Sequence, residues 1–133
     1  MQKRTLNNEN SSKIQYDSKA LSSNNSLRLK SEFDNVRRNG KKYVSKYFLL
    51  IFTDSIDNKL KYGIICGRKF SKKAVTRNRV RRLIKESFRL INAQLKVNHI
   101  VFIPRKSMIN SKMQDIHKEM INSCKKVGLW KQK

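Results

Sequence analysis

The sequence predicts an α+β fold: helix, two or three strands, helix, strand, helix, arranged around a sheet of about four strands. Two stretches, residues 43–52 and 60–67, are rich in aromatic and β-branched side chains, as strands are. From residue 74 to 95, apolar side chains recur at steps of three or four, which is typical of an amphipathic helix. A third apolar stretch, residues 99–103, is short enough for one more strand and is followed by Pro104.

The first 26 residues are predicted to be a mobile tail that precedes a single domain, residues 27–133. The tail is rich in Asn, Ser, Gln and Lys, and Tyr16 is its only aromatic residue. It therefore cannot bury enough apolar surface to offset the entropy lost on ordering. The remaining 107 residues suffice for one modest core.

Within the domain, the first helix is expected from Ser31 to Asn39. Ser31 suits the N-cap, and Gly40 is placed to end the helix in a left-handed conformation. The stretches 43–52 and 60–67 follow on either side of a polar segment, so they are expected to form an antiparallel hairpin. A further short strand near residues 42–45 would bring the strands before the second helix to three.

The first strand could face the helices in two ways. Alternation sends Phe48, Leu50 and Phe52 to one face of the strand and Tyr47, Leu49 and Ile51 to the other. One set joins the core, and the other could stack unpaired bases on an open sheet face. The sequence does not decide which set looks away from the main helices.

The second helix, residues 74–95, carries the densest charge of the chain. Its apolar stripe consists of Val80, Leu83, Ile84, Phe88, Ile91 and Leu95. At roughly 100° per residue, the opposite arc holds Asn78, Arg79, Arg81, Arg82, Lys85 and Arg89, with Arg77 at its border. Between residues 68 and 89, ten basic residues accompany one acid, Glu86, so pairing within the helix cannot neutralise the charge. We expect a rigid cationic ridge that binds phosphate groups.

The third helix is predicted to begin at Ser111, where residues 111–114 have the form of a capping box. Gly128 is expected to end it. Its apolar stripe consists of Met113, Ile116, Met120, Cys124 and Val127. Cys66 and Cys124 lack the spacing of a metal site or a disulfide framework, so both are expected to be reduced core thiols.

The composition indicates a polyanionic partner. With 32 Lys and Arg against 9 Asp and Glu, the net charge is +23 on 133 residues, and nucleic acid is the default partner of such a chain. No apolar run approaches the ~20 residues of a membrane span. Residues 1–8 are polar and unlike a signal peptide, so we expect a cytoplasmic protein with no membrane partner.

The sequence shows no catalytic pattern, and neither a catalytic nor a metal-binding residue is predicted. Asp54 and Asp57 lie in a polar segment where Asp is expected for turn chemistry. His99 and His117 have no partner pattern and are expected at the surface or the domain boundary. The four glycines form no phosphate-binding loop. The chemistry that this chain serves is therefore expected to be performed by a partner.

Residues 74–89, AVTRNRVRRLIKESFR, resemble the RNR signature of the bacterial ribonuclease P protein component. Residues 29–40, 62–65 and 100–105 are similar to the family's first helix, the strand before the signature and the last strand, so the resemblance covers about residues 27–127. It implies a fold like domain 2 of ribosomal protein S5. That fold has a left-handed crossover between the parallel strands that flank the RNR helix, whereas general handedness rules favour the right-handed form.

The resemblance also implies a function. The chain would be a subunit of the ribonucleoprotein that removes the 5′ leader from precursor tRNA, with catalytic Mg²⁺ held by the RNA subunit and no cofactor bound by the protein. Its partners would be that RNA and precursor tRNA, with no obligate protein partner. The residues expected to bind the RNA subunit are Lys69, Lys72, Lys73, Arg77, Asn78, Arg79, Arg81, Arg82, Lys85 and Arg89. A cleft lined by Phe33, Arg37, Lys42, Phe48 and Ile51 would bind the single-stranded leader.

Three features depart from the family pattern. Arg37 and Ile51 stand where the family often has aromatic residues, which implies weaker stacking on the leader and more charge contact. Residues 70–73, Phe-Ser-Lys-Lys, occupy a loop that commonly includes glycine. The N-terminal tail is longer than the family minimum.

Two other classes of protein remain as alternatives. A DNA-binding or ribosome-associated protein would place the same basic helix in a groove, and strong displacement of RNA by duplex DNA would favour it. An independent nuclease would cleave RNA in the presence of metal ions without any RNA subunit.

Overall fold

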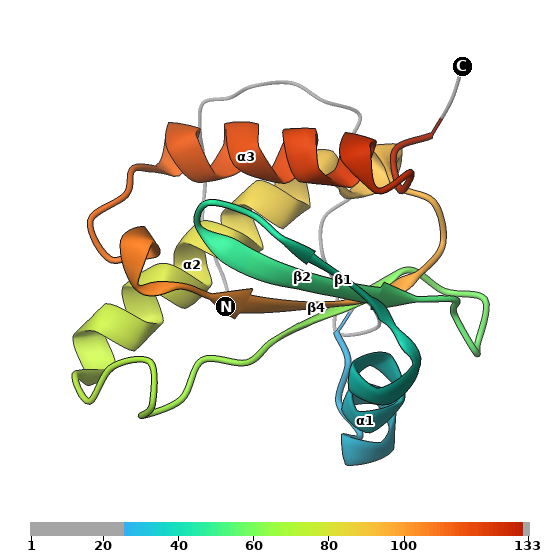
Figure 1. Cartoon of the computed structure of the whole chain (residues 1–133), viewed down its shortest axis with the longest axis horizontal. Coiled ribbons are helices and arrows are strands. Elements are labelled where there is room, and N and C mark those ends of the chain that lie inside the picture. Colours follow the sequence, from blue (N-terminus) through green and yellow to red (C-terminus); the bar gives the residue numbers. More distant parts are fainter. Residues whose placement is uncertain (1–25, 132–133) are drawn as a thin grey trace.

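The sheet separates one helix from the other two in the computed structural model, which describes residues 26–131 (Figure 1). In chain order the elements are α1 (Lys30–Asn39), β1 (Lys41–Val44), β2 (Phe48–Thr53), β3 (Lys61–Ile64), α2 (Ala74–Ile91), β4 (His99–Pro104) and α3 (Met113–Lys126), with short 3₁₀ turns η2 (Asn92–Gln94) and η3 (Lys106–Met108). The α+β class, the four strands and the three helices confirm the prediction from sequence.

The strands lie in the order β1-β2-β4-β3, so the last strand of the chain is inside the sheet. β2 pairs antiparallel with β1 and β4, and β3 pairs parallel with β4. The predicted hairpin of residues 43–52 with 60–67 is therefore wrong. Residues 43–52 instead divide at Ser45, whose side-chain oxygen accepts a hydrogen bond from the Phe48 amide (3.2 Å), and the hairpin forms between β1 and β2. β4 is buried along almost its whole length, which suits a central position that a turn-based prediction cannot detect.

The main core lies between the sheet and the pair α2 and α3. Phe48 and Leu50 of β2 point into this layer, which answers the question of strand orientation that alternation left open. Phe88 of α2 stacks on Tyr62 with ring centroids 4.4 Å apart and meets Phe102 edge-on at 5.9 Å. The buried residues that α2 and α3 contribute are Val80, Leu83, Ile84, Phe88, Ile91, Ile116, Met120 and Cys124. The predicted apolar stripes of both helices thus face the sheet.

A second, smaller core lies on the opposite face of the sheet, under α1. Its buried members are Leu27, Val36, Ile51 and Val101, and Phe33, Leu49, Ile65 and Ile103 pack around them. Because α1 covers only part of this face, several side chains of β2 and β4 stay partly accessible beside it.

The ends of α1 differ from the prediction. The N-cap position belongs to Leu29, and Ser31 lies inside the helix. The side chain of Glu32 accepts hydrogen bonds from the amides of Arg28 (2.9 Å) and Leu29 (3.1 Å), so a carboxylate replaces the expected serine hydroxyl as the capping group. Gly40 has a φ of −81°, so it does not end the helix through a left-handed conformation.

α3 begins at Met113, later than predicted, because Asp115 caps the amide of Lys112 while the Ser111 hydroxyl donates to the Met108 carbonyl (2.7 Å). Its C-terminal end agrees with the prediction. Gly128 has a φ of +83°, and the Leu129 amide donates to the Cys124 carbonyl (2.9 Å) as in a Schellman motif.

Of the predicted tail, residues 1–26, only Ser26 is among the described residues, and it forms an isolated bridge with Tyr62. Cys66 and Cys124 are buried free thiols, as expected. No helix in residues 26–131 is long and apolar enough to span a membrane. The left-handed sense of the crossover through α2 stays a prediction.

Candidate nucleic-acid interface

The outer side of α2 and the loop before it form one basic surface, here called the basic helix face. Its cations are Arg68, Lys69, Lys72, Lys73, Arg77, Arg79, Arg81, Arg82, Lys85 and Arg89. Arg77 and Arg89 are partly buried, and the other eight are exposed. The first turn of α2 contains no acidic residue, so no side chain there offsets the positive end of the helix dipole. The arrangement confirms the cationic ridge predicted from periodicity.

Two arginines of this face also hold the preceding loop. Arg77 donates to the Ser71 carbonyl (2.9 Å) and Arg81 to the Cys66 carbonyl (2.6 Å). Phe70 is buried in the main core and anchors the same loop from the other side. Residues 66–73 are therefore fixed against α2, although residues 70–73 lack the glycine that the family commonly has in this loop.

Arg79 makes a comparable contact with a more distant segment. Its guanidinium donates to the carbonyls of Ile109 (2.8 Å) and Ser111 (2.5 Å), which precede α3. By contrast, Arg82 and Lys85 are exposed, and their side chains make no hydrogen bond or ion pair with any residue in 26–131. The face thus combines cations that fix its shape with cations whose donors are directed to solvent. Periodicity alone predicted both kinds as one set.

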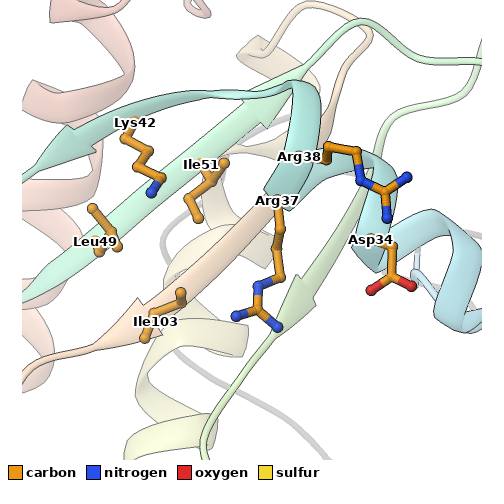
Figure 2. Close-up of a pocket in the computed structure, with 7 residues that line it drawn as sticks. All are labelled: Asp34, Arg37, Arg38, Lys42, Leu49, Ile51 and Ile103. Carbon is orange, nitrogen blue, oxygen red and sulfur yellow. The ribbon is translucent and has the colours of Figure 1, made fainter.

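A cleft of about 500 Å³ lies beside α1 on the opposite face of the sheet. Its lining residues are Asp34, Arg37, Arg38, Lys42, Leu49, Ile51 and Ile103. In Figure 2 the guanidinium of Arg37 extends from α1 toward Ile103, and the side chain of Lys42 points from β1 toward β2. Arg37 and Lys42 therefore flank an aliphatic floor, while the guanidinium of Arg38 points away from it, to the side of Asp34 (Figure 2). None of the three cations has a hydrogen bond or ion pair through its side chain with another described residue.

Three of the five residues predicted for the leader cleft, Arg37, Lys42 and Ile51, line this cleft. Phe33 packs beside it in the smaller core. Phe48 does not belong to it: its side chain is fully buried in the main core, because its position in β2 points to α2 and α3. Because side chains alternate along a strand, Phe48 and Ile51 point to opposite faces of the sheet, and Phe48 cannot reach the cleft.

The sequence analysis missed four lining residues: Asp34, Arg38, Leu49 and Ile103. The sequence did contain a signal for Asp34 and Arg38, because their spacing from Arg37 places all three on one side of α1. Leu49 lies on the strand face of Ile51. Ile103 comes from β4, whose pairing with β2 joins distant parts of the chain and leaves no local signal.

Near the start of α1, an ionic cluster links Glu32, Asp57, Lys61 and His99. Lys61 lies 2.7 Å from Asp57 and 3.0 Å from Glu32, and the His99 ring nitrogen Nε2 lies 3.0 Å from Asp57. The expectation of a surface or boundary position for His99 is wrong, because its side chain is fully buried where β4 begins between β2 and β3. Asp57 retains its turn role and accepts a hydrogen bond from the Lys59 amide (3.2 Å).

Electrostatics in this cluster favour the charged forms. The hydrogen bond from Lys61, helped by those from His99 and Ser55, holds the pKa of Asp57 well below its usual value. Burial opposes ionisation of Glu32, but the backbone amides and Lys61 outweigh it and lower its pKa. The two carboxylates raise the pKa of Lys61. Within residues 26–131, no group of three His, Cys, Asp or Glu side chains is placed to hold a metal ion.

An α+β sheet with a basic helix on one face and a cation-lined cleft on the other defines a class of protein: a small domain that binds nucleic acid. Comparison with known proteins identifies the family within this class. Residues 21–128 match the family model described as Ribonuclease P. The chain belongs to the family of bacterial ribonuclease P protein components, the RNA-binding protein subunits of a ribonucleoprotein endoribonuclease.

Individual proteins of this family are similar to the chain in sequence and in structure. The ribonuclease P protein component of Clostridium botulinum strain Loch Maree is 38% identical over 108 residues, which is 80% of this chain and 96% of the relative. That of Rickettsia bellii is 36% identical over 104 residues, covering 71% and 87%. The ribonuclease P protein of Thermotoga maritima superposes with a TM-score of 0.67 at 30% identity, covering 75% of this chain and 94% of the other. The Staphylococcus aureus protein, at 18% identity and a TM-score of 0.72, shares the fold.

Proposed function

We propose that this chain binds the catalytic RNA of ribonuclease P through the basic helix face and binds the 5′ leader of precursor tRNA in the cleft beside α1. In this way it supports removal of the leader, which generates the mature 5′ end of the tRNA. The RNA subunit supplies the active site and its Mg²⁺ ions. The protein supplies positive charge and a shaped surface at the two places where RNA must be held.

The observation that carries the proposal is the position of the unpaired cations. Lys69, Lys72, Lys73, Arg82 and Lys85 are exposed on the basic helix face, and their side chains have no partner in the described part of the chain. These cations can pair with phosphate, and release its counterions, without first breaking an ion pair within the protein. Arg77, Arg79 and Arg81 fix the segments around them, so the cations are presented on a rigid support.

The cleft suits a single strand. Arg37, Arg38 and Lys42 can follow a phosphate backbone, while Leu49, Ile51 and Ile103 offer an aliphatic surface to bases or riboses. No aromatic side chain of residues 26–131 lines the cleft. Binding there therefore depends more on charge than on stacking, as the departures at Arg37 and Ile51 led us to expect. Because α1 and α2 lie on opposite faces of the sheet, the leader and the RNA subunit can be engaged together (Figure 1).

Reconstitution tests this function. The protein, the host's RNA subunit and a precursor tRNA are combined at low magnesium concentration, and release of the leader is measured, with protein alone and RNA alone as controls. Cleavage is expected only in the complete mixture. Cleavage by the protein alone would indicate an independent nuclease. In a separate competition measurement, strong displacement of the RNA subunit from the protein by duplex DNA would favour a DNA-binding protein. No improvement over RNA alone would exclude the proposed role.

Arg82→Ala combined with Lys85→Ala tests the basic helix face. The side chains of these cations are not bound to other described residues, so their removal should weaken binding of the RNA subunit without unfolding the protein. The slope of log K against log salt should fall by roughly 0.7 to 0.9 for each phosphate that is no longer neutralised. Lys118→Ala with Lys126→Ala, which removes two exposed cations of α3, is the matched control. An equal change of slope in both double variants would mean that net charge alone, and not this face, determines binding.

Arg37→Ala combined with Lys42→Ala tests the cleft. The relevant quantity is the leader ratio, defined as the affinity of the reconstituted enzyme for precursor tRNA divided by its affinity for mature tRNA. The double variant should lower this ratio and leave the affinity for mature tRNA unchanged, because only the leader reaches the cleft. A parallel reduction for both RNAs would place the two cations elsewhere in the complex.

A further inference from the structure

Acidic side chains are scarce in this chain, and two of them converge on one lysine. The 133 residues contain 9 Asp and Glu against 32 Lys and Arg. Lys61 nevertheless contacts both Glu32 (3.0 Å) and Asp57 (2.7 Å), with side-chain exposures of 16% for Lys61, 9% for Glu32 and 31% for Asp57. The other ion pair between carboxylate and Lys or Arg in residues 26–131 joins Glu86 to Arg89 within one helix. The Lys61 cluster is therefore the ionic contact that connects separate elements.

The cluster holds the N-terminal end of α1 to the sheet. One carboxylate oxygen of Glu32 accepts the amides of Arg28 and Leu29 and so caps α1, while its other oxygen contacts Lys61 at the start of β3. One side chain thus caps the helix and attaches it to a strand. Removing Lys61 would leave the cap but break this ionic contact.

The strand side of the cluster is rigid. Lys61 is the register partner of His99, whose side chain is fully buried. The ring nitrogen Nε2 of His99 lies 3.0 Å from Asp57 and 3.3 Å from the Ser55 hydroxyl. The loop between β2 and β3 is therefore held against the edge of the sheet, and it presents Asp57 to Lys61 from a fixed position.

Besides this ionic contact, α1 is held to the sheet by packing on the smaller core, and Leu27, shortly before it, donates its amide to the Tyr62 carbonyl (2.9 Å). Of its ten residues only Glu32 and Val36 are buried. Phe33 rests against Gly63 of β3, where the ring leaves no room for a side chain. The same short helix carries Arg37 and Arg38 of the cleft, one to two turns beyond Glu32. The way in which the first turn of α1 is held thus bears on where these cations lie relative to the cleft floor.

We propose that Lys61 is a positioning residue for the leader: by bridging Glu32 and Asp57 it fixes the orientation of α1 on the sheet and so sets the gap between Arg37 and the floor of the cleft. The inference rests on the proposed function, since it assumes that this cleft holds the leader. Lys61 need not touch RNA, because both of its carboxylate contacts are made within the protein.

The test compares Lys61→Met with Lys59→Met in the reconstituted enzyme. The two substitutions remove the same charge two residues apart, but the Lys59 side chain is exposed and its ammonium has no partner in residues 26–131. Lys61→Met should lower the leader ratio roughly threefold to tenfold and leave the affinity for the RNA subunit and for mature tRNA as in the wild type. Lys59→Met should leave all three unchanged.

Two further variants keep the inference testable if Lys61→Met folds poorly. Lys61→Arg retains both carboxylate contacts and should restore the ratio, whereas Glu32→Gln retains the acceptor that caps α1 but removes the ion pair and should lower it. A leader ratio at the wild-type value in folded Lys61→Met and Glu32→Gln would overturn the inference, even if both melt at lower temperature. If the wild-type enzyme itself shows no leader ratio above one, the proposed function of the cleft fails instead.

Discussion

Gly40 connects α1 to β1 at a point where two stretches of backbone nearly touch. A side chain at this position would begin 2.9 Å from the Phe52 carbonyl oxygen and closer still to that of Val36. The sequence predicted the glycine as a helix terminator with positive φ, but its φ of −81° is open to any residue. The requirement for glycine is therefore close approach, which no pattern within the helix can indicate.

Gly40→Ala is expected to destabilise the protein by about 1–3 kcal/mol, because backbone atoms must move to admit the methyl group. Urea unfolding of the isolated protein measures the change. Gly67→Ala is the control, since nothing lies within 4 Å of its new methyl group, and it should alter the unfolding free energy by less than about 0.5 kcal/mol. Equal effects of the two substitutions would contradict the close approach at Gly40.

The acidic residues of the Lys61 cluster predict how stability depends on pH. The pKa values of Asp57 and Glu32 are lowered in the folded state, so their stabilisation is fully present above the ordinary values of 3.8 and 4.5. It is lost as pH falls through the folded values. The destabilisation caused by Asp57→Asn should therefore be largest near neutral pH and shrink below about pH 4.

Urea unfolding of wild type and Asp57→Asn at several pH values between neutrality and pH 3 checks this dependence. Asp54→Asn changes the same charge in the same loop, at a carboxylate without a partner in the described residues, and serves as the control. A difference between Asp57→Asn and wild type that stays constant with pH would show that the ion pair with Lys61 adds nothing to stability.

At the scale of elements, α2 shows what periodicity can and cannot predict. The apolar stripe was found from the sequence because it repeats along one helix, and every member from Val80 to Leu95 is buried. The predicted end at residue 95 is wrong, because α2 ends at Ile91 and Leu95 follows the 3₁₀ turn η2. The contacts of Arg77, Arg79 and Arg81 could not be found, because their acceptors are carbonyl groups of other segments. A carbonyl belongs to every residue and so leaves no trace in the amino-acid sequence.

Arg79→Lys and Arg82→Lys separate the two kinds of arginine on α2 while keeping the charge. Lysine cannot reproduce the forked contact with Ile109 and Ser111, so Arg79→Lys should cost about 1 kcal/mol of unfolding free energy. Arg82→Lys should cost almost nothing, because the guanidinium of Arg82 has no partner in the described part of the chain. Thermal unfolding of the two variants provides the measurement, and the reverse order of stability would refute the structural role of Arg79.

At the scale of the whole molecule, local patterns predicted the elements but not their neighbours. The helices and most strand residues follow from composition and spacing within each segment. The pairing of β4 with both β2 and β3 joins residues far apart in sequence, and the predicted β2–β3 hairpin failed for that reason. The cleft was predicted only in part. The family resemblance placed Arg37 and Ile51 in it, whereas Ile103 joins it through the pairing of β4 with β2, which no local pattern indicates.

The net charge of +23 predicts how the free protein responds to salt. Repulsion among the unpaired cations should be screened as ionic strength rises, because the Debye length falls to about 8 Å near 0.15 M salt. The melting temperature should therefore increase by about 5 °C or more between low and physiological salt. Scanning calorimetry with sodium chloride tests this, and a falling melting temperature would mean that ion pairs such as Lys61–Asp57 outweigh the repulsion.

The position of β4 inside the sheet has a consequence for synthesis of the chain. β4 is the last of the four described strands to be made, yet without it β3 has no neighbour in this sheet and β2 meets only β1. The first three strands must therefore leave the ribosome before the sheet can close, and one edge of β2 stays unpaired until residues 99–104 emerge. During that interval α2 is complete and strongly cationic while the core that orients it is missing. The basic helix is therefore synthesised before the sheet that orients it is complete, and its charge attracts polyanions such as ribosomal RNA until residues 99–104 are made.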